Sequence, residues 1–440
     1  MMRSHALFCV SVLFLVVFDS PASHAQAPSE ATPAQDLTLA QAETTAMANQ
    51  PRILAAQLRA RASGERIREA KSGFLPTVGF NATGVRVADT GTATAAGNIT
   101  TSSISDRFAY GANLAQLVTD FGRTSALIRS ARSNAEAQSD LATLTRAQVR
   151  LNVREAFYQV LGAEAVLRAA QAAQDNRQLI SRQLSALAQS QLRSTLDVNF
   201  ANVLESEAEL AVVRAKSTVA QQRVHLATAM GLQQPVAAPL SDVSPSNDAL
   251  PISPDDLLQQ AQSQRADLNA AQAQQHAAQQ FALSEKKLSY PTLNVLAAAG
   301  QIPYHDHTLH DDYAAAGFNL NIPVFNGGLF AARRDEADLE ANARNRDVQQ
   351  LKLEVSEQVR DAWYQANEAY QALDVNNRLV AQSKEALRLA QDRYNAGLGS
   401  IVELNEAQLN ETSAEIEAAD STYTYLSRRA ELDFAAGLLN

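Results

Sequence analysis

Hydrophobic residues follow two periods along this chain, and the shorter period marks four segments. In the first segment Val78 and Phe80 share one face, and in the last Phe318 and Leu320 alternate with asparagines. Alternation of this kind predicts β-strands, at about 77–87, 108–118, 292–300 and 313–323. Strands of roughly ten residues can cross a bilayer when tilted in a barrel, but a soluble hairpin with one wet face has the same pattern.

Between these segments, apolar residues recur at helical spacing over long stretches without proline. As one helix, residues 124–192 would span roughly 100 Å. Residues 38–73 and 196–231 predict two helices of roughly 54 Å each, so the two short helices laid end to end equal the long one. The second half of the chain repeats this arrangement. Seams of Ala, Leu and Val permit close helix packing, so we expect a rod, with a free-standing coiled-coil stalk as the alternative.

The chain is an internal tandem duplication. Residues 156–159 read Ala-Phe-Tyr-Gln and recur as Ala-Trp-Tyr-Gln at 362–365, an offset of 206 from 156 to 362 that also relates Gly122 to Gly328. The sequence therefore predicts two copies of one repeat, joined by a proline-rich linker and preceded by a secretory signal peptide with a short apolar stretch. The ranges are 1–25 for the signal peptide, 37–232 and 252–438 for the repeats, and 233–251 for the linker.

Composition agrees with long helices and excludes some classes of function. The chain has 17 glycines and 13 prolines in 440 residues, and only 6% of its residues are aromatic. Its net charge of -10 argues against a nucleic-acid partner. Cys9, the single cysteine, lies in the predicted signal peptide, so the exported chain cannot form disulfides. There is no nucleophile elbow, phosphate-binding loop or paired catalytic signature, so we expect neither an enzyme nor a cofactor.

Several motifs in a fixed order complete the sequence pattern. They are Leu-Thr-Leu-Ala-x-Ala at 37–42, Asn-Gln-Pro-Arg-Ile at 49–53, Phe-Leu-Pro at 74–76, Asp-Phe-Gly at 120–122, Phe-Asn-Gly-Gly at 325–328 and Tyr-x-x-Gly-x-x-Ser-Ile-Val-Glu-Leu at 394–404. Together with the duplicated helix and strand pattern, they make the chain resemble the TolC family of outer-membrane efflux channels. The resemblance covers nearly all of the predicted mature chain.

The resemblance implies a fold and an assembly. The fold class would be a mixed α/β membrane protein, mainly long α-helices, in which a homotrimer forms an α-helical tunnel and a 12-stranded β-barrel with four strands from each chain. Physics requires some oligomer, because four strands cannot close a barrel and an open sheet edge is not tolerated in lipid. The number three comes from the resemblance.

The resemblance also implies a function and partners. The chain would be a passive outer-membrane exit duct of a tripartite efflux or secretion system, with its helices in the periplasm. Its partners would be a periplasmic adaptor, an inner-membrane transporter of the RND or ABC type, and outer-membrane lipid. The alternatives are a type I protein secretion duct and a coiled-coil surface protein without a pore.

Four residues near the predicted hairpin turns match the family's periplasmic aperture: Asp197, Tyr394, Glu403 and Glu406. Acidic side chains clustered there in a trimer would hold cations, and the counterpart of Tyr394 helps to hold the aperture shut. Asp197 and Glu403 are equally suited to capping their helices. Gly399 and Gln191 depart from the family pattern, which puts the exact closing contacts in doubt.

The same turns resemble the part of the family that contacts the adaptor. The candidate contacts are Leu192, Ser194, Gly397, Leu398 and Ser400.

A histidine-rich segment lies in the predicted external loop of the second copy. His305, His307 and Asp311 are weak candidates for binding zinc or copper. A solvated polar loop is the favoured interpretation, so no metal is predicted.

Overall fold

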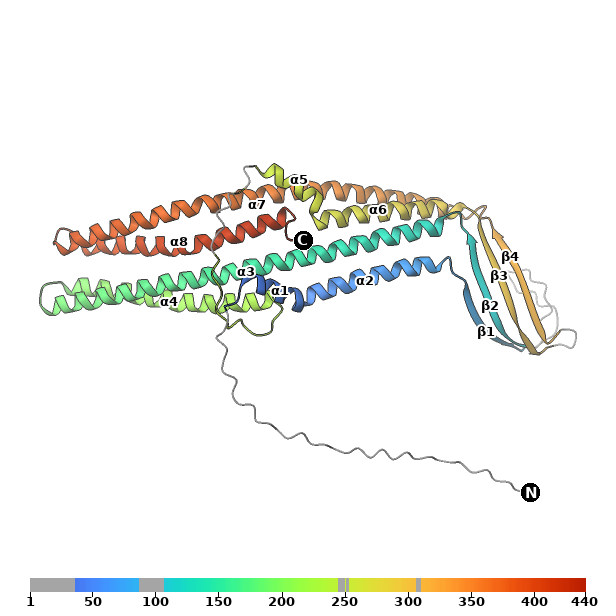
Figure 1. The fold of residues 1–440 in the computed structure, drawn as a ribbon, viewed down its shortest axis with the longest axis horizontal. Coiled ribbons are helices and arrows are strands. Elements are labelled where there is room, and N and C mark those ends of the chain that lie inside the picture. Colours follow the sequence, from blue (N-terminus) through green and yellow to red (C-terminus); the bar gives the residue numbers. More distant parts are fainter. Residues whose placement is uncertain (1–35, 87–106, 244–249, 251–252, 306–309) are drawn as a thin grey trace, which may run out of the picture.

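The computed structural model describes residues 36–86, 107–243, 250, 253–305 and 310–440 (Figure 1). The expected signal peptide and nearly all of the loop 87–107 lie outside these residues. None of the described helices is long and apolar enough to cross a membrane. In chain order the elements are α1 (Leu39–Asn49), α2 (Pro51–Ser72), β1 (Thr77–Val85), β2 (Arg107–Thr119), α3 (Arg123–Gln189), α4 (Thr195–Ala229), α5 (Pro254–Gln264), α6 (Ala266–Lys286), a 3-10 turn (Lys287–Ser289), β3 (Thr292–Tyr304), β4 (Asp312–Asn321), α7 (Leu329–Asn395) and α8 (Ile401–Ala435).

The helices form two long hairpins that lie side by side (Figure 1). α3 and α7 are each 67 residues long, and α4 and α8 are each 35. α2 and α4 both pack along α3, and α6 and α8 both pack along α7. Each copy therefore has one long helix beside two shorter ones, and this confirms the predicted fold class at the level of the single chain.

The helix predicted over 38–73 is wrong in one respect, because the chain breaks it at Gln50. Gln50 has φ −72° and ψ 115°, since Pro51 disfavours the helical region for the residue before it. The second copy breaks at the equivalent Arg265, with φ −64° and ψ 123°, although no proline follows. The side-chain amide of Gln50 donates to the carbonyl of Ala229 at 3.0 Å, and the Arg265 guanidinium donates to Ala435 at 3.4 Å. The side chain at each break therefore donates a hydrogen bond to a carbonyl group at the carboxyl end of a neighbouring helix.

The four strands form one antiparallel sheet in the order β1-β2-β3-β4. β1 ends at Val85, two residues before its expected end at 87. β3 continues to Tyr304, four residues beyond its expected end at 300, because β3 pairs along the long β2. β4 ends at Asn321, before Pro323, which has no N–H to donate to a neighbouring strand. The sheet extends from one end of the helical rod, and the end of β3 and the start of β4 lie far from the helices (Figure 1).

The two faces of the sheet have different chemistry. Because paired residues share a face, the register places most of the large apolar side chains on one face and the glycines and asparagines on the other, although Leu117, Leu296 and Tyr313 also lie on this second face. The apolar face carries Val78, Phe80, Leu114, Leu293, Val295, Phe318 and Leu320. The polar face carries Gly79, Asn81, Gly111, Asn113, Asn294, Gly300, Gly317 and Asn319.

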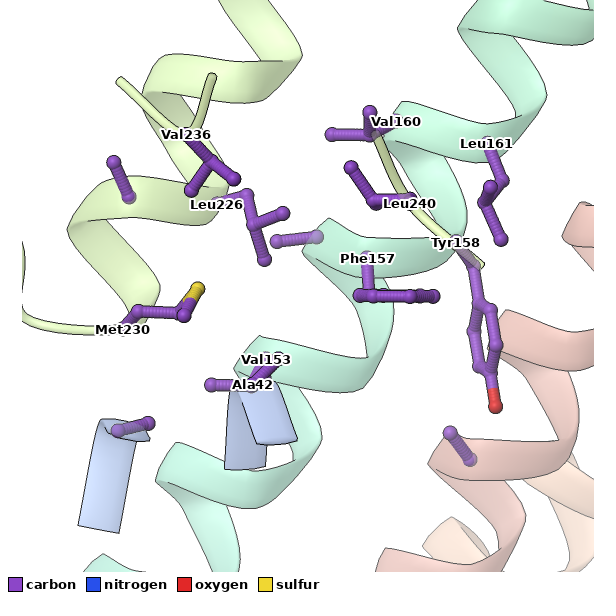
Figure 2. Packing of buried hydrophobic residues seen from close by; sticks show 14 of the residues in the cluster. Ala42, Val153, Phe157, Tyr158, Val160, Leu161, Leu226, Met230, Val236 and Leu240 are labelled. Carbon is purple, nitrogen blue, oxygen red and sulfur yellow. The ribbon is translucent and has the colours of Figure 1, made fainter. Parts of the chain in front are cut away.

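The largest core cluster lies halfway along the helices, where α1 and the linker pack on α3. Phe157 is fully buried and packs with Leu226, Met230, Val236 and Leu240, whose side chains Figure 2 shows directed toward one another. The described part of the expected linker is therefore held against the helices. Backbone pairing of Leu37 with Leu240 fixes it there.

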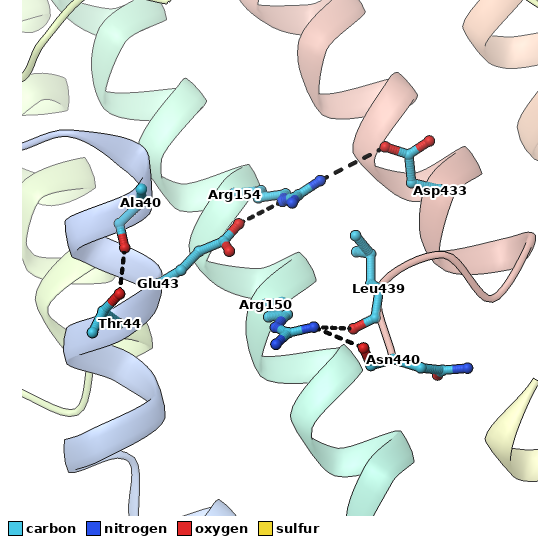
Figure 3. Close-up of polar contacts among 8 residues, drawn as sticks. All are labelled: Ala40, Glu43, Thr44, Arg150, Arg154, Asp433, Leu439 and Asn440. Carbon is cyan, nitrogen blue, oxygen red and sulfur yellow. Dashed lines mark hydrogen bonds and ion pairs between the residues drawn. The ribbon is translucent and has the colours of Figure 1, made fainter.

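An arginine joins the two copies at the same level. Arg154 on α3 pairs with Glu43 on α1 at 2.6 Å and reaches Asp433 on α8 at 3.6 Å (Figure 3). All three side chains are partly shielded from solvent. One cation therefore links helices from both repeats.

Candidate functional site

The two hairpin tips are the turns between α3 and α4 and between α7 and α8. Gln191 has φ 60° and Gly397 has φ 75°, so both occupy the left-handed region. The amides of Leu192 and Leu398 each donate to the carbonyl five residues earlier, at 2.9 Å. This is the hydrogen-bond pattern of a Schellman motif, and it gives both tips the same turn from different residues.

A serine begins the returning helix at each tip. The Ser194 hydroxyl accepts from the Leu196 amide at 3.1 Å, and the Ser400 hydroxyl accepts from the Glu403 amide at 3.2 Å. The Glu403 carboxylate pairs with Arg393 at 3.1 Å. The two hydroxyls therefore cap their helices. Of the two acidic residues considered for capping, Asp197 lies in the first turn of α4, whereas the Glu403 carboxylate pairs with Arg393 near the end of α7.

The structure brings Asp197 and Tyr394 together across the two hairpins. The Tyr394 hydroxyl donates to the Asp197 carboxylate at 3.1 Å. The guanidinium of Arg193 lies 4.2 Å from the centre of the Tyr394 ring and donates to the Tyr394 carbonyl at 3.0 Å. The first tip therefore holds the last turn of α7 through a hydrogen bond, a cation–π contact and a backbone contact.

The Tyr394 ring is also the centre of a small apolar cluster. It is only 5% exposed. The other buried members come from α3, α4, α7 and α8: Leu184, Ala201, Ala390, Ile401 and Leu404. Both hairpins therefore share one core immediately behind their tips.

Burial, and then the nearby Asp197 charge, raise the pKa of the Tyr394 phenol, against the opposing effect of Arg193. A phenol with a raised pKa stays protonated at neutral pH. The hydroxyl is therefore a permanent donor to Asp197 under physiological conditions.

The other two aperture candidates have different surroundings. Glu403 and Glu406 are exposed on α8. Among the described residues, no ion pair involves Glu406, whereas Glu403 pairs with Arg393. In one chain these two carboxylates are thus not in contact with the Asp197–Tyr394 link.

The candidate adaptor contacts lie on the outside of the two turns. Leu192 is 70% exposed and Leu398 is 75% exposed. Ser194, Gly397 and Ser400 lie beside them in the same turns. Each tip therefore presents a leucine to solvent.

The weak metal candidates are only partly described. The His305 imidazole and the Asp311 carboxylate lie 2.8 Å apart, and His307 lies outside the described residues. Within the described ranges, no three His, Cys, Asp or Glu side chains form a group that could hold a metal ion.

Two arginines of the tips were missed by sequence reasoning. Arg193 and Arg393 flank the turns, and each contacts an acidic or aromatic candidate. Comparison of the two repeats could have drawn attention to Arg193, because its equivalent in the second copy is Gly399. A side chain present in only one copy is free to take a role that the other copy lacks.

The chain matches a known protein family along most of its length. The family model described as outer membrane efflux protein matches residues 44–232 and 257–438. The chain belongs to the outer membrane efflux protein family. This confirms the resemblance to that family and the expected outer-membrane location. The family is one of channels, not of enzymes.

Relatives of this chain are distant in sequence. It is 24% identical over 305 residues to the outer membrane protein TolC of Salmonella enteritidis, a match that covers 66% of this chain and 61% of that protein. It is 24% identical over 404 residues to TolC of Escherichia coli strain K12, covering 86% and 78%. The chain thus matches less than two thirds of the first relative's length.

A solved structure shares the fold. The outer membrane protein VceC of Vibrio cholerae superposes with a TM-score of 0.78 at 17% identity, covering 91% of this chain and 96% of that chain. The shared fold therefore persists where few residues are the same.

A buried arginine and a nearby ion pair farther from the tips also escaped sequence reasoning. Arg177 on α3 is buried and donates to the side chain of Gln408 on α8, and Lys384 pairs with Glu415 at 2.7 Å. Burial lowers the pKa of Arg177, and burial and then Glu415 raise the pKa of Glu411. A lone arginine within a long amphipathic helix gives no sequence signal of burial.

Proposed function

We propose that three copies of this chain form a passive exit duct, in which the sheets close one barrel and the helices form a tunnel below it. The observation that carries the proposal is the sheet. Among the described residues, β1 and β4 each pair with one strand only, and the apolar face leaves Phe318 78% exposed. An open edge beside an exposed apolar face suits lipid only when neighbouring copies complete the sheet.

The internal repeat supports the same assembly. Within one chain, α3 packs against α6 and α8 of the other copy. The equivalent of α3 is α7, so the same packing around α7 would be made with α2 and α4 of the next chain. These helices carry exposed apolar residues that a neighbour would cover: Leu54, Leu58, Leu210, Val213, Val224, Leu353, Tyr364 and Val375.

Polar hollows along one side of the helices support a wet passage. A hollow of about 460 Å³ lies between α2, α3 and α4, one of about 210 Å³ between α3 and α8, and one of about 290 Å³ between α7 and α8. The first two share Gln159, and the last two share Asp420 and Arg428. This side of α3 differs from the side that packs on α1 and the linker, where Val153 and Phe157 are buried. A water-filled tunnel needs such a polar wall.

The exposed leucines of the tips support docking of a periplasmic adaptor, which would couple the duct to an inner-membrane transporter of the RND or ABC type. Asp197, Tyr394, Glu403 and Glu406 would form the aperture in the trimer. Leu192 and Leu398 give the adaptor an apolar contact on each tip. Replacing both by aspartate should abolish adaptor cross-linking while leaving channel conductance intact, and unchanged cross-linking would contradict this role.

The decisive experiment tests the two faces of the sheet. Because the predicted mature chain has no cysteine, Phe318→Cys and Asn319→Cys provide a matched pair on neighbouring positions of β4. In outer-membrane vesicles, the thiol of the Phe318→Cys variant should react with a lipid-soluble maleimide, and that of the Asn319→Cys variant with a water-soluble one. Equal aqueous labelling of both variants, together with no conductance in planar bilayers, would reject the duct in favour of a soluble stalk.

A further inference from the structure

One row of paired residues crosses the polar face of the sheet near its far end. The row joins Asn81, Gly111, Gly300 and Tyr313 on β1, β2, β3 and β4. Tyr313 is the second residue of β4, so it lies far from the helices. The other described aromatic residues within the strands, including Phe80 and Phe318, belong to the apolar face.

The two glycines leave a space that the tyrosine occupies. A Cβ atom built on Gly111 would clash with the Tyr313 hydroxyl oxygen and with the backbone oxygen of Ala299, and one built on Gly300 would lie 2.7 Å from the Tyr313 hydroxyl oxygen. Tyr313 is 37% exposed, which agrees with a ring that covers the sheet and shows one side to solvent. The phenol therefore lies across β3 toward β2, over positions that have no side chain.

Another glycine on the same face, Gly79, also leaves space for a longer side chain of the neighbouring strand. A Cβ on Gly79 would lie 2.8 Å from the side-chain oxygen of Asn113, and Asn113 also accepts a hydrogen bond from Asn81 at 2.7 Å. Longer side chains on the polar face thus lie against glycines of the neighbouring strand. The pattern occurs twice on neighbouring rows, so it is a property of this face.

We propose that the Gly111–Gly300 pair is a seat that holds the Tyr313 ring flat against the wall and so keeps the ring from narrowing the outer end of the duct. The inference rests on the proposed function, because the polar face is the inner wall only in a barrel. Three rings, one from each chain, would otherwise project into the passage at one level. The seat removes that obstruction.

The matched control is a tyrosine without a seat. Ala315 lies two residues along β4 on the same face, and its neighbours across the sheet are Ala298 and Asn113. A tyrosine at position 315 would meet a methyl group and an amide instead of two glycines. Substituting the glycines themselves is less informative, because a Cβ on Gly300 would also lie 2.2 Å from the backbone oxygen of Tyr110 and would displace the strand.

The test measures polymer exclusion from the outer side of single channels in planar bilayers, for Tyr313→Ala, Ala315→Tyr and the double variant. We expect Tyr313→Ala to leave the exclusion size unchanged, and Ala315→Tyr with or without Tyr313→Ala to reduce polymer entry by about twofold or more. Chemical cross-linking to the same oligomer as the wild-type chain checks the folding and assembly of each variant.

The outcomes separate the two proposals. If the wild-type chain forms no channel, the proposed function itself fails. If the wild type conducts and Tyr313→Ala raises the exclusion size, the ring projects into the passage and the seat is overturned. Tyr313→Ala alone decides this, even if Ala315→Tyr does not assemble.

Discussion

The two copies of the repeat build the same turns from different residues. Both described non-glycine residues with positive φ lie in the first copy, Phe121 at 53° and Gln191 at 60°. Their equivalents in the second copy are glycines, Gly327 at 66° and Gly397 at 75°. Since a side chain in this region costs about 1–2 kcal/mol, the first copy carries a strain that the second avoids. The ends of the helices therefore impose the left-handed conformation of the turn, whichever residue occupies that position.

The tips also divide the contacts between them. Arg193 and Asp197 of the first tip hold Tyr394 of the second. The equivalent of Tyr394 is Ala188, so the reverse contact cannot form. The duplication therefore gives both hairpins the same backbone, but their side chains differ. The first tip supplies the contacting residues, and the second tip supplies the tyrosine that they contact.

Changing Tyr394 to the alanine of the first copy should have the largest effect. The buried ring would be lost from the shared core, at a cost of about 3–4 kcal/mol in the local stability of the tips. Hydrogen exchange of the tip amides should accelerate accordingly, and channel conductance should rise. Tyr394→Phe is the control, because it removes only the hydroxyl bond to Asp197 and should cost about 1 kcal/mol. Equal losses for both variants would mean that the ring contributes little.

Exchanging the turn residues of the two tips should have opposite effects. Gly397→Gln should destabilise the second tip by about 1–2 kcal/mol, and Gln191→Gly should stabilise the first by up to about 1 kcal/mol. A Cβ on Gly397 would meet nothing within 4 Å, so its cost would come from φ alone. Exchange protection of the Leu192 and Leu398 amides reports the two effects. Destabilisation by both changes would show that Gln191 makes a contact in the assembly that outweighs its strain.

The start of α3 should be more sensitive to acid than the start of α7. The buried Asp120 carboxylate accepts from the Thr124 amide at 2.7 Å, whereas in the second copy the side chain of Asn326 accepts from Phe330 at 3.5 Å. Although burial opposes it, hydrogen bonds from Thr124 and its neighbours lower the pKa of Asp120. This stabilisation is therefore present above about pH 4 and is lost as pH falls through the lowered pKa.

Asp120→Asn tests this difference. It should cost about 1 kcal/mol at neutral pH and remove the acid dependence of Thr124 exchange, while Phe330 exchange, corrected for intrinsic rate, stays the same. An acid transition of equal size at both helix starts would point to another group.

The smallest effect on stability should come from Glu403. Its pair with Arg393 is exposed, so Glu403→Ala should change stability by no more than about 0.5 kcal/mol. If the carboxylates form a ring in the trimer, the same variant should weaken block by divalent cations, measured as conductance against cation concentration. Glu403→Asp, which copies Asp197, keeps the charge but shortens the reach to Arg393, and should retain the block. Loss of block in both variants would assign the effect to the ion pair.

Much of the fold could be predicted because it depends on local patterns. The 206-residue offset related the hairpins before the structure did, and both long helices have 67 residues as the repeat requires. The alternating pattern predicted the four strands. The predicted strand ends were wrong where strand pairing and Pro323 determine the actual ends. Pro51 gave a signal for the broken helix, but Arg265 gave none, because its contact with the Ala435 carbonyl at the end of α8 joins residues far apart in the chain.

By itself, the sequence determined the duplication, the helix lengths, the two-faced strands and the residues of the tips, since each of these follows from periodicity or from motifs a few residues long. Only the tertiary structure decided that Arg193 and Asp197 meet Tyr394, and that Tyr313 lies over Gly111 and Gly300. These contacts join residues far apart in the chain. Their geometry depends on how helices cross and strands align, which no local pattern encodes.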